Sequence, residues 1–341
     1  MRKEFGALPD GRMVYVYTIR KGGLEAHILD LGATLQRLYV PDAEGRLADV
    51  VLGFDRPEDY INSATFFGAI IGRNSNRLQL GTFTLNDNNY TMGTNDGKNN
   101  LHSGPDFFKD RIWNVEWVSD NSICLSLNSP DGDQGFPGNA RICVTYTLED
   151  NGVLVVSYDA VCDQDTVFNL TNHSYFNLAG HDHPQKAMDM LLTMPARIFT
   201  PDDAESIPTG ECRPVDGTPM DFRVQKPIGR DIHADYDALI LQNGYDHNYE
   251  VYTNPCAALM DKDSGRCMTV NTDCPGIQFY SGNFLKGEVG KDGVKYSFRG
   301  GICLETQYYP NALNHIEWKK PITKAGTPYH SETKFIFSAI R

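Results

Sequence analysis

A two-residue alternation of apolar and polar side chains recurs along the chain and limits its fold more than any other feature. In residues 141–149 and 153–161 every second side chain is apolar: Ile142, Val144, Tyr146 and Leu148, then Leu154, Val156, Tyr158 and Ala160. Successive side chains of a β-strand point to opposite faces, so each run predicts a strand with one buried face. Asp150–Gly152 between them predicts a tight turn. A helical period is scarce, and residues 56–62 predict one or two helical turns at most.

The rest of the chain fits the same fold class. Its 31 glycines, 18 prolines, 17 tyrosines and 17 phenylalanines suit turns and strands better than helices. A length of 341 residues suggests about two domains, yet no linker or shift in composition divides the chain. We therefore expect one all-β domain over residues 1–341, predominantly antiparallel and built as a barrel or stacked sandwich.

The charge balance excludes some partners. Lys and Arg number 31 and Asp and Glu 44, which gives a net charge of −13. Nucleic acids and anionic membranes are polyanions, so neither is expected as a partner. The chain has no apolar run of signal-peptide or membrane-spanning length. None of its eight cysteines forms a C-x-x-C pair, and we expect reduced cysteines in a cytoplasmic protein.

Four polar clusters interrupt the strand pattern: residues 72–77, 99–105, 169–180 and 301–311. Arg73 and Arg77 in the first could be surface charges or could aim a guanidinium into a pocket. His102 in the second could be a structural loop histidine. His173 in the third lies among many polar groups that a buried segment must satisfy by hydrogen bonds, which favours a structured site. Glu305 in the fourth follows three apolar residues, and a buried carboxylate is usually paired, protonated or functional.

Several ligand motifs are incomplete. Residues 93–98 do not have the spacing of a phosphate-binding loop, and residues 131–135 lack the later ligands of a calcium loop. His181 and His183 could form a metal pair on a strand face, but no third ligand lies at a diagnostic spacing. We therefore predict no metal site.

Taken in order, the clusters and their neighbours resemble the aldose 1-epimerase (galactose mutarotase) family. The stretches that carry the resemblance are 48–54, 67–77, 100–102, 129–138, 172–178, 246–249, 275–283 and 303–312. They include Asn172-His-Ser-Tyr-Phe-Asn-Leu178 and Cys303-Leu-Glu-Thr-Gln307 and extend from about residue 48 to 315, nearly the whole chain. The departures are Ser103, Ser281 and Asn74-Ser75, where the family usually has Gly, Thr and an aromatic or aliphatic residue followed by Ala. None of them removes a catalytic group.

The resemblance implies a β-supersandwich fold and an isomerase without an organic cofactor. Carried over position by position, it implies Glu305 as general base and His173 as general acid. It also implies sugar contacts from Asn76, Arg77, His102, Tyr175, Asp246 and Gln278. The substrate would be a free aldose such as glucose or galactose, bound by a monomer or homodimer.

The chemistry of these residues suits that reaction. Interconversion of α and β anomers removes the proton of the C1 hydroxyl and protonates the ring oxygen, which a carboxylate and an imidazolium can do together. We therefore expect an ionised Glu305 and a protonated His173 when sugar binds. Three alternatives stay open: an epimerase acting on hexose 6-phosphates or a related sugar, a glycoside hydrolase using Asp246 and Glu305, and a non-catalytic sugar-binding protein.

Overall fold

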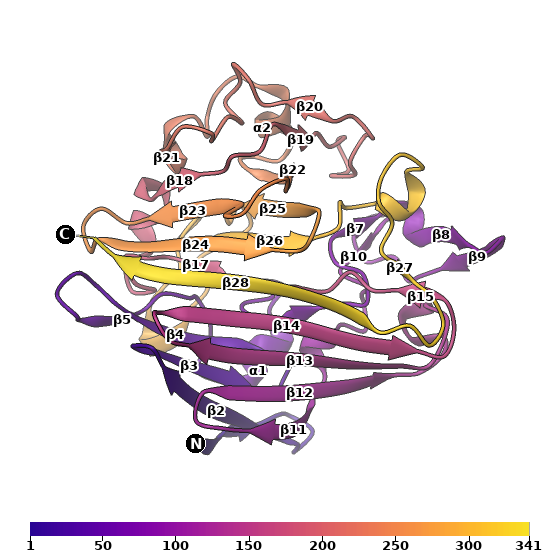
Figure 1. Ribbon diagram of the computed structural model, residues 1–341, viewed down its shortest axis with the longest axis horizontal. Coiled ribbons are helices and arrows are strands. Elements are labelled where there is room, and N and C mark those ends of the chain that lie inside the picture. Colours follow the sequence, from indigo (N-terminus) through magenta and orange to yellow (C-terminus); the bar gives the residue numbers. More distant parts are fainter. Residues whose placement is uncertain (341) are drawn as a thin grey trace.

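The computed structural model describes residues 1–340 and consists mainly of antiparallel sheets (Figure 1). The largest sheet has nine strands in the spatial order β11 (Asn114–Val118), β12 (Ser122–Ser129), β13 (Ala140–Glu149), β14 (Val153–Cys162), β28 (Tyr329–Ala339), β24 (Arg266–Thr272), β23 (Ala257–Met260), β18 (Leu191–Thr193) and β21 (Lys226–Pro227). The predicted turn at residues 150–152 joins β13 to β14, with Glu149 opposite Val153. The predicted strands and turn are therefore confirmed.

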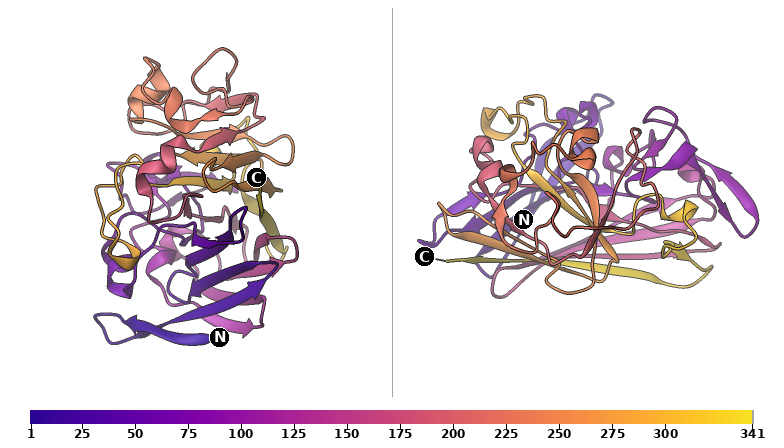
Figure 2. Two further views of the ribbon diagram at one scale, coloured as in Figure 1. Left: turned by 90° about the vertical axis from the view of Figure 1, so that its left-hand side faces the viewer. Right: turned by 90° about the horizontal axis from the view of Figure 1, so that it is seen from above.

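Two further sheets pack against the large one. A five-stranded sheet contains β1 (Arg2–Ala7), β2 (Met13–Lys21), β3 (Leu24–Leu29), β4 (Leu35–Pro41) and β5 (Leu47–Asp49). A six-stranded sheet has the order β17 (Tyr175–Phe176), β26 (Ile302–Gln307), β25 (Gly276–Tyr280), β22 (Asp246–Glu250), β19 (Ile198–Thr200) and β20 (Arg213–Pro214). Figure 2 shows the long strands of the large sheet along one side of the molecule and the other elements stacked over them.

Short elements complete the fold. Four two-stranded pairs are β6 (Ile70–Ile71) with β16 (Thr171–Asn172), β7 (Arg77–Leu78) with β10 (Asn100–Leu101), β8 (Thr82–Leu85) with β9 (Asn88–Thr91), and β15 (Thr166–Val167) with β27 (Ile322–Thr323). The described residues form two short α-helices, α1 (Pro57–Asn62) and α2 (Asp237–Leu241), and α1 is the one or two turns predicted at 56–62. Neither α-helix could cross a bilayer, and the same holds for every other helix in residues 1–340.

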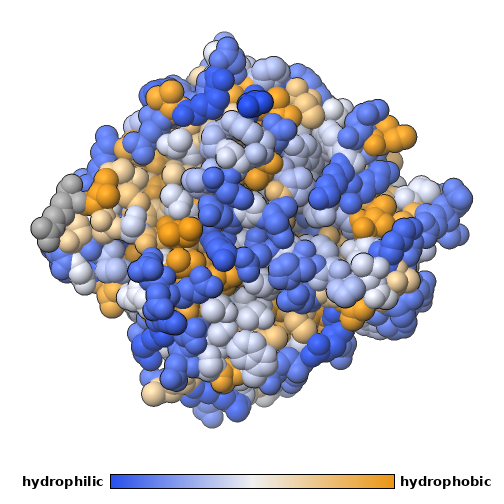
Figure 3. All heavy atoms as spheres, in the orientation of Figure 1, coloured by the Kyte–Doolittle hydropathy of each residue, from blue (hydrophilic) through white to orange (hydrophobic). Residues whose placement is uncertain are grey.

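One hydrophobic core joins the three large sheets. It contains Leu38 of β4, Val144 of β13 and Phe279 of β25, each fully buried. Alternation explains this packing, because the apolar residues of β13 and β14 point inward while Arg141, Thr145 and their neighbours point outward. Figure 3 shows the outward face, on which hydrophilic side chains predominate. The predicted all-β fold is confirmed.

Candidate active site

The floor of the site is the polar face of the six-stranded sheet. Its strand register places Asp246 opposite Tyr280, Tyr280 opposite Cys303, and Cys303 opposite Tyr175. Gln278 lies opposite Glu305 on the same face, since paired residues of neighbouring strands point the same way. Side chains one position along, such as Phe279 and Leu304, point into the core. The alternation that builds the sheet therefore gathers these polar groups on one surface.

A cavity of about 350 Å³ lies over this floor. Asn76, Arg77 and His102 line its wall from the β7–β10 pair and the residues beside it. The wall is held by two hydrogen bonds: Asn76 N–H donates to His102 Nδ1 (3.1 Å), and His102 N–H donates to the carbonyl oxygen of Asn76 (3.0 Å). Asn76 and His102 both have left-handed backbones, with φ of 60° and 54°. Backbone geometry of this kind is concentrated at functional sites.

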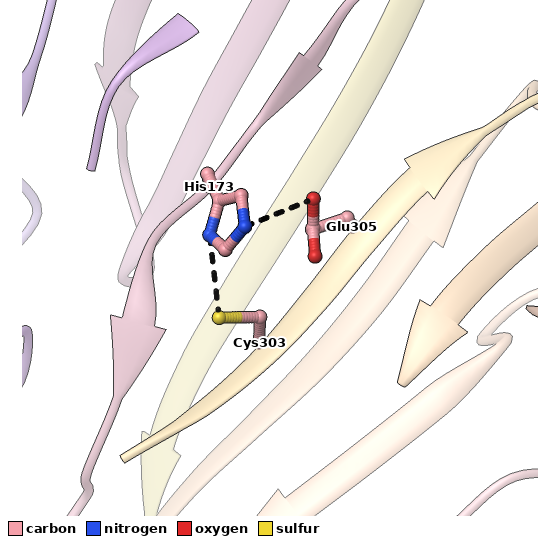
Figure 4. A group of neighbouring side chains, drawn as sticks. All are labelled: His173, Cys303 and Glu305. Atoms are coloured by element: carbon pink, nitrogen blue, oxygen red, sulfur yellow. Dashed lines mark hydrogen bonds and ion pairs between the residues drawn. The ribbon is translucent and has the colours of Figure 1, made fainter. Parts of the chain in front are cut away.

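His173 and Glu305 face each other across a short gap (Figure 4). His173 Nε2 lies 3.7 Å from Glu305 Oε2, which is too long for a hydrogen bond. Both side chains are more than 90% buried, and Glu305 Oε2 has no hydrogen-bond partner among residues 1–340. An acceptor and a ring nitrogen are thus held beside the cavity with their hydrogen-bonding capacity unused.

Burial sets the protonation of this pair. Burial lowers the pKa of His173 to about 4, and the rings of Phe66 and Tyr175 stack on its imidazole at centroid distances of 5.7 and 5.2 Å. Burial, with a smaller contribution from the carboxylate of Asp246, raises the pKa of Glu305 well above its ordinary value. Both shifts favour the neutral forms in the free protein. The ionised Glu305 and protonated His173 expected from the sequence belong to the sugar-bound enzyme and stay a prediction.

A second polar group lies around Arg77 and Asp246, which also line the cavity. Arg77 Nε donates to Asp96 Oδ2 (2.7 Å), and Arg77 Nη1 lies 3.9 Å from Asp246 Oδ2. Gln278 Nε2–H donates to Asp246 Oδ1 (2.8 Å). Burial raises the pKa of Asp246, while Arg77 and the Gln278 hydrogen bond partly oppose that rise. Asp246 is therefore held in place from two directions.

The predicted site residues are brought together with one exception. Seven of the eight line the cavity: Asn76, Arg77, His102, His173, Tyr175, Asp246 and Glu305. Gln278 is not among the lining residues, and its amide lies against Asp246 instead. Gln278 Oε1 has no hydrogen-bond partner among residues 1–340, and the direct sugar contact predicted for this residue stays a prediction.

Sequence reasoning missed Phe66, Asp96, Tyr280 and Cys303, which contact predicted site residues or lie beside them, and further lining residues such as Lys286 and Glu288. Tyr280 and Cys303 could have been found, because each lies two residues from a predicted site residue on its own strand and so shares its face. Phe66 and Asp96 precede short strands and loops, and nothing in the local pattern marks them.

The two arginines of residues 72–77 have different environments. Arg77 lines the cavity, as one of the two interpretations of that cluster predicted. Arg73 is fully buried away from the cavity and donates to backbone carbonyls of residues 129–138. It is neither a surface charge nor a sugar ligand, and it holds a loop in place.

One group of candidate metal ligands exists among the described residues: His173, Cys303 and Glu305, whose ligand atoms lie within 4.8 Å of one another. Figure 4 shows that Nδ1 of the imidazole points to the sulfur of Cys303 while Nε2 points to Glu305. A metal ion binds along the lone pair of one ring nitrogen, so a single ion would not replace both contacts. The arrangement suits proton transfer better than metal binding.

Comparison with known proteins agrees with the geometry. The family model described as aldose 1-epimerase matches residues 15–335. Galactose mutarotase of Sus scrofa is 42% identical over 343 residues, which cover 99% of this chain and 98% of the relative. Aldose 1-epimerase of Escherichia coli (strain K12) is 35% identical, with 99% and 100% covered. The crystal structure of the GalM/aldose epimerase homologue from C. elegans has a TM-score of 0.88 at 31% identity, covering 96% of this chain and 99% of that one. These findings confirm the predicted β-supersandwich and the predicted enzyme class: the chain is an isomerase that belongs to the aldose 1-epimerase family.

Proposed function

We propose that this enzyme interconverts the α and β anomers of a free aldose with Glu305 as base and His173 as acid. The observation that carries the proposal is the 3.7 Å separation of His173 Nε2 and Glu305 Oε2, both buried beside the cavity. The C1 hydroxyl and the ring oxygen of a sugar are attached to the same carbon, so two groups this close can serve both. Glu305 Oε2 is a free acceptor for the hydroxyl proton.

The reaction then proceeds in two half-steps. The pair reacts in the form in which its shared proton lies on His173. Glu305 takes the proton of the C1 hydroxyl while His173 Nε2–H protonates the ring oxygen, and the C1–O bond to the ring breaks to give the open-chain aldehyde. After rotation about C1–C2, the ring hydroxyl attacks the other face of the aldehyde, returns its proton to His173, and the new C1 oxygen takes the proton from Glu305. Each proton transfer contributes about 10²–10⁴ in rate.

The remaining lining residues hold the sugar in place. His102 Nδ1 accepts a hydrogen bond from Asn76 N–H, so the ring proton of a neutral His102 is on Nε2 and can be donated to a sugar hydroxyl. Burial lowers the pKa of His102 well below its usual value, which keeps the ring neutral. Arg77 and Asn76 donate to sugar oxygens, and Asp246 accepts from sugar hydroxyls. Tyr175 contributes its ring and hydroxyl, and Gln278 acts through Asp246, which it orients.

Charge at the opening favours an unphosphorylated substrate. Lys286 is accompanied there by Asp96 and Glu288, so the mouth carries no excess of positive charge. A phosphate group would meet two carboxylates as well as one ammonium. This supports free sugars over hexose 6-phosphates.

Polarimetry of freshly dissolved α-glucose tests the proposal directly. We expect the enzyme to accelerate the decay of optical rotation to the equilibrium value without changing that value, because an epimerase shifts no equilibrium. Glucose 6-phosphate should react more slowly, and p-nitrophenyl glycosides should release no nitrophenol. Nitrophenol release would contradict the proposal and point to a hydrolase.

The pH dependence follows from the two shifted groups. The pair must hold one shared proton: below about pH 4 a second proton binds His173 and leaves no base, and above the raised pKa of Glu305 the shared proton leaves and removes the acid. The kcat/KM, which reports the groups of the free enzyme, should therefore stay level between these two limits and fall on both sides. With ordinary pKa values of about 4.3 and 6.5 the optimum would lie near pH 5.5 and activity would already decline by about pH 7. Measurement of kcat/KM against pH, corrected for buffer catalysis, separates the two profiles.

We also propose that residues 1–341 act as a single domain, since three sheets share one core and the cavity draws on residues from 64 to 305. The remaining sequence-based predictions are a monomer or homodimer, a cytoplasmic location and no nucleic-acid or membrane partner.

A further inference from the structure

The two ring nitrogens of His173 have different surroundings. Nε2 faces Glu305, whereas Nδ1 lies 3.5 Å from Sγ of Cys303 (Figure 4). Cys303 belongs to β26, two residues before Glu305, and therefore points to the same face of the sheet. Its side chain is fully buried and does not line the cavity. A sugar in the cavity would thus meet Nε2, while Nδ1 meets a thiol.

The acid role of His173 requires that Nδ1 carry a hydrogen. In every turnover Nε2 gives a proton to the ring oxygen and later takes it back. After it has given the proton, the ring is neutral only if Nδ1 carries a hydrogen. A neutral ring protonated on Nε2 alone could donate only by becoming an imidazolate anion. The working tautomer therefore keeps a hydrogen on Nδ1, and that hydrogen needs an acceptor.

We infer that the sulfur of Cys303 accepts a hydrogen bond from Nδ1–H of His173, and that Cys303 is a positioning residue which holds the imidazole in the tautomer whose Nε2 exchanges protons with the sugar. The inference rests on the proposed function, because it uses the acid role of His173. The 3.5 Å separation suits a bond to sulfur, which has a larger radius than oxygen. No covalent bond of Cys303 is formed or broken, and its thiol keeps its own hydrogen throughout.

Ring stacking and the contact with Cys303 fix different aspects of the orientation of the His173 imidazole. The rings of Phe66 and Tyr175 each stack on the imidazole with an interplanar angle of 21°, which fixes the plane of the ring. Stacking does not distinguish the two edges of the ring, since a half-turn about the Cβ–Cγ bond keeps the ring plane but exchanges the positions of Nδ1 and Cδ2 and those of Nε2 and Cε1. The contact with Cys303 makes that distinction, because sulfur lies at one side only.

A thiol is a suitable partner for a ring that must act as an acid. Burial and the neighbouring carboxylates of Glu305 and Asp246 raise the pKa of Cys303 well above its usual value, so the sulfur remains uncharged. A carboxylate at this position would stabilise the imidazolium and weaken it as an acid. A neutral sulfur orients Nδ1–H while adding little to the basicity of the ring.

Two variants of Cys303 and nitrogen NMR of the histidines test the inference. Cys303→Ala removes the acceptor, and Cys303→Ser keeps a hydrogen-bonding oxygen. For Cys303→Ala we expect kcat to fall by about tenfold with KM changed less than about threefold, while Cys303→Ser recovers most of the loss. In ¹⁵N spectra the neutral His173 of the unsubstituted enzyme should carry its hydrogen on Nδ1, and Cys303→Ala should move it largely to Nε2. His173→Gln identifies the signal among the nine histidines.

Two results would overturn the inference: a wild-type His173 that carries its hydrogen on Nε2, or a Cys303→Ala enzyme with unchanged kcat and unchanged tautomer. The tautomer of His173 is measured on the wild-type enzyme, so this result tests the inference even if Cys303→Ala fails to fold. The activity of His173→Gln separates this inference from the proposed function. Near-full activity of His173→Gln would refute the acid role itself, whereas an inactive His173→Gln beside a fully active Cys303→Ala would refute only the role of Cys303.

Discussion

Replacing Glu305 by glutamine should reduce kcat by at least about 10² while leaving the fold intact. Glutamine has nearly the same shape, so the packing on β26 is preserved, but its amide cannot take the proton of the C1 hydroxyl. Oε2 of Glu305 makes no hydrogen bond to residues 1–340, so no structural contact of that atom is lost. Polarimetry gives the rate, and thermal unfolding followed by circular dichroism checks the fold.

Glu149→Gln supplies the matched control for Glu305→Gln. Glu149 is an exposed carboxylate at the end of β13, outside the cavity, and its replacement should leave the rate unchanged. Near-full activity of Glu305→Gln would exclude Glu305 as the base. A large loss in both variants would instead indicate an effect of net charge.

Replacing Arg73 by methionine should destabilise the fold by about 3–5 kcal/mol, as removal of one partner from a buried charged network does. The guanidinium donates to four backbone carbonyls, those of Ser129, Pro130, Pro137 and Gly138, and to the hydroxyls of Ser129 and Thr166. Methionine fills much of the volume but removes all of these hydrogen bonds; the carbonyls of Pro130 and Pro137 then keep the donors Asp133 N–H and the Thr166 hydroxyl. Urea unfolding followed by tryptophan fluorescence measures the loss.

Arg12→Met is the control for Arg73→Met. Arg12 is an exposed arginine paired with Asp10, and its removal should leave the unfolding midpoint unchanged. The folded fraction of Arg73→Met should bind sugar normally, since Arg73 does not line the cavity. An unfolding midpoint equal to that of the wild type would show that residues 129–138 hold their place without this arginine.

The strands were predictable because their signal is local. The core-facing residues of β13 are those that the alternation predicted: Ile142, Val144, Tyr146 and Leu148. A half-buried strand is recognisable because its apolar side chains recur at every second residue. The local pattern could not show that Arg73 is buried away from the cavity while Arg77 lines it. Both follow the same apolar strand, and the distinction depends on residues 129–138 and Asp246, which reach them from distant parts of the chain.

The residues that form the site were more predictable than their protonation states. The family resemblance placed His173 and Glu305 in one site, and the structure brings them to 3.7 Å. The neutral forms that burial favours in the free protein could not be predicted, because the pKa of each group depends on how completely other segments exclude water from it. Phe66, for example, stacks on His173 from more than a hundred residues away in sequence.

The position of β28 has a consequence for the folding of the enzyme. This strand lies between β14 and β24 and joins the two parts of the nine-stranded sheet (Figure 1). The hydroxyl of its Thr333 also contacts the hydroxyl of Thr306, the neighbour of Glu305. A chain in which residues 329–339 have not yet paired therefore has two open strand edges, which can pair with other chains. The folding enzyme consequently closes both edges and gains the support of its catalytic strand when this one strand is added.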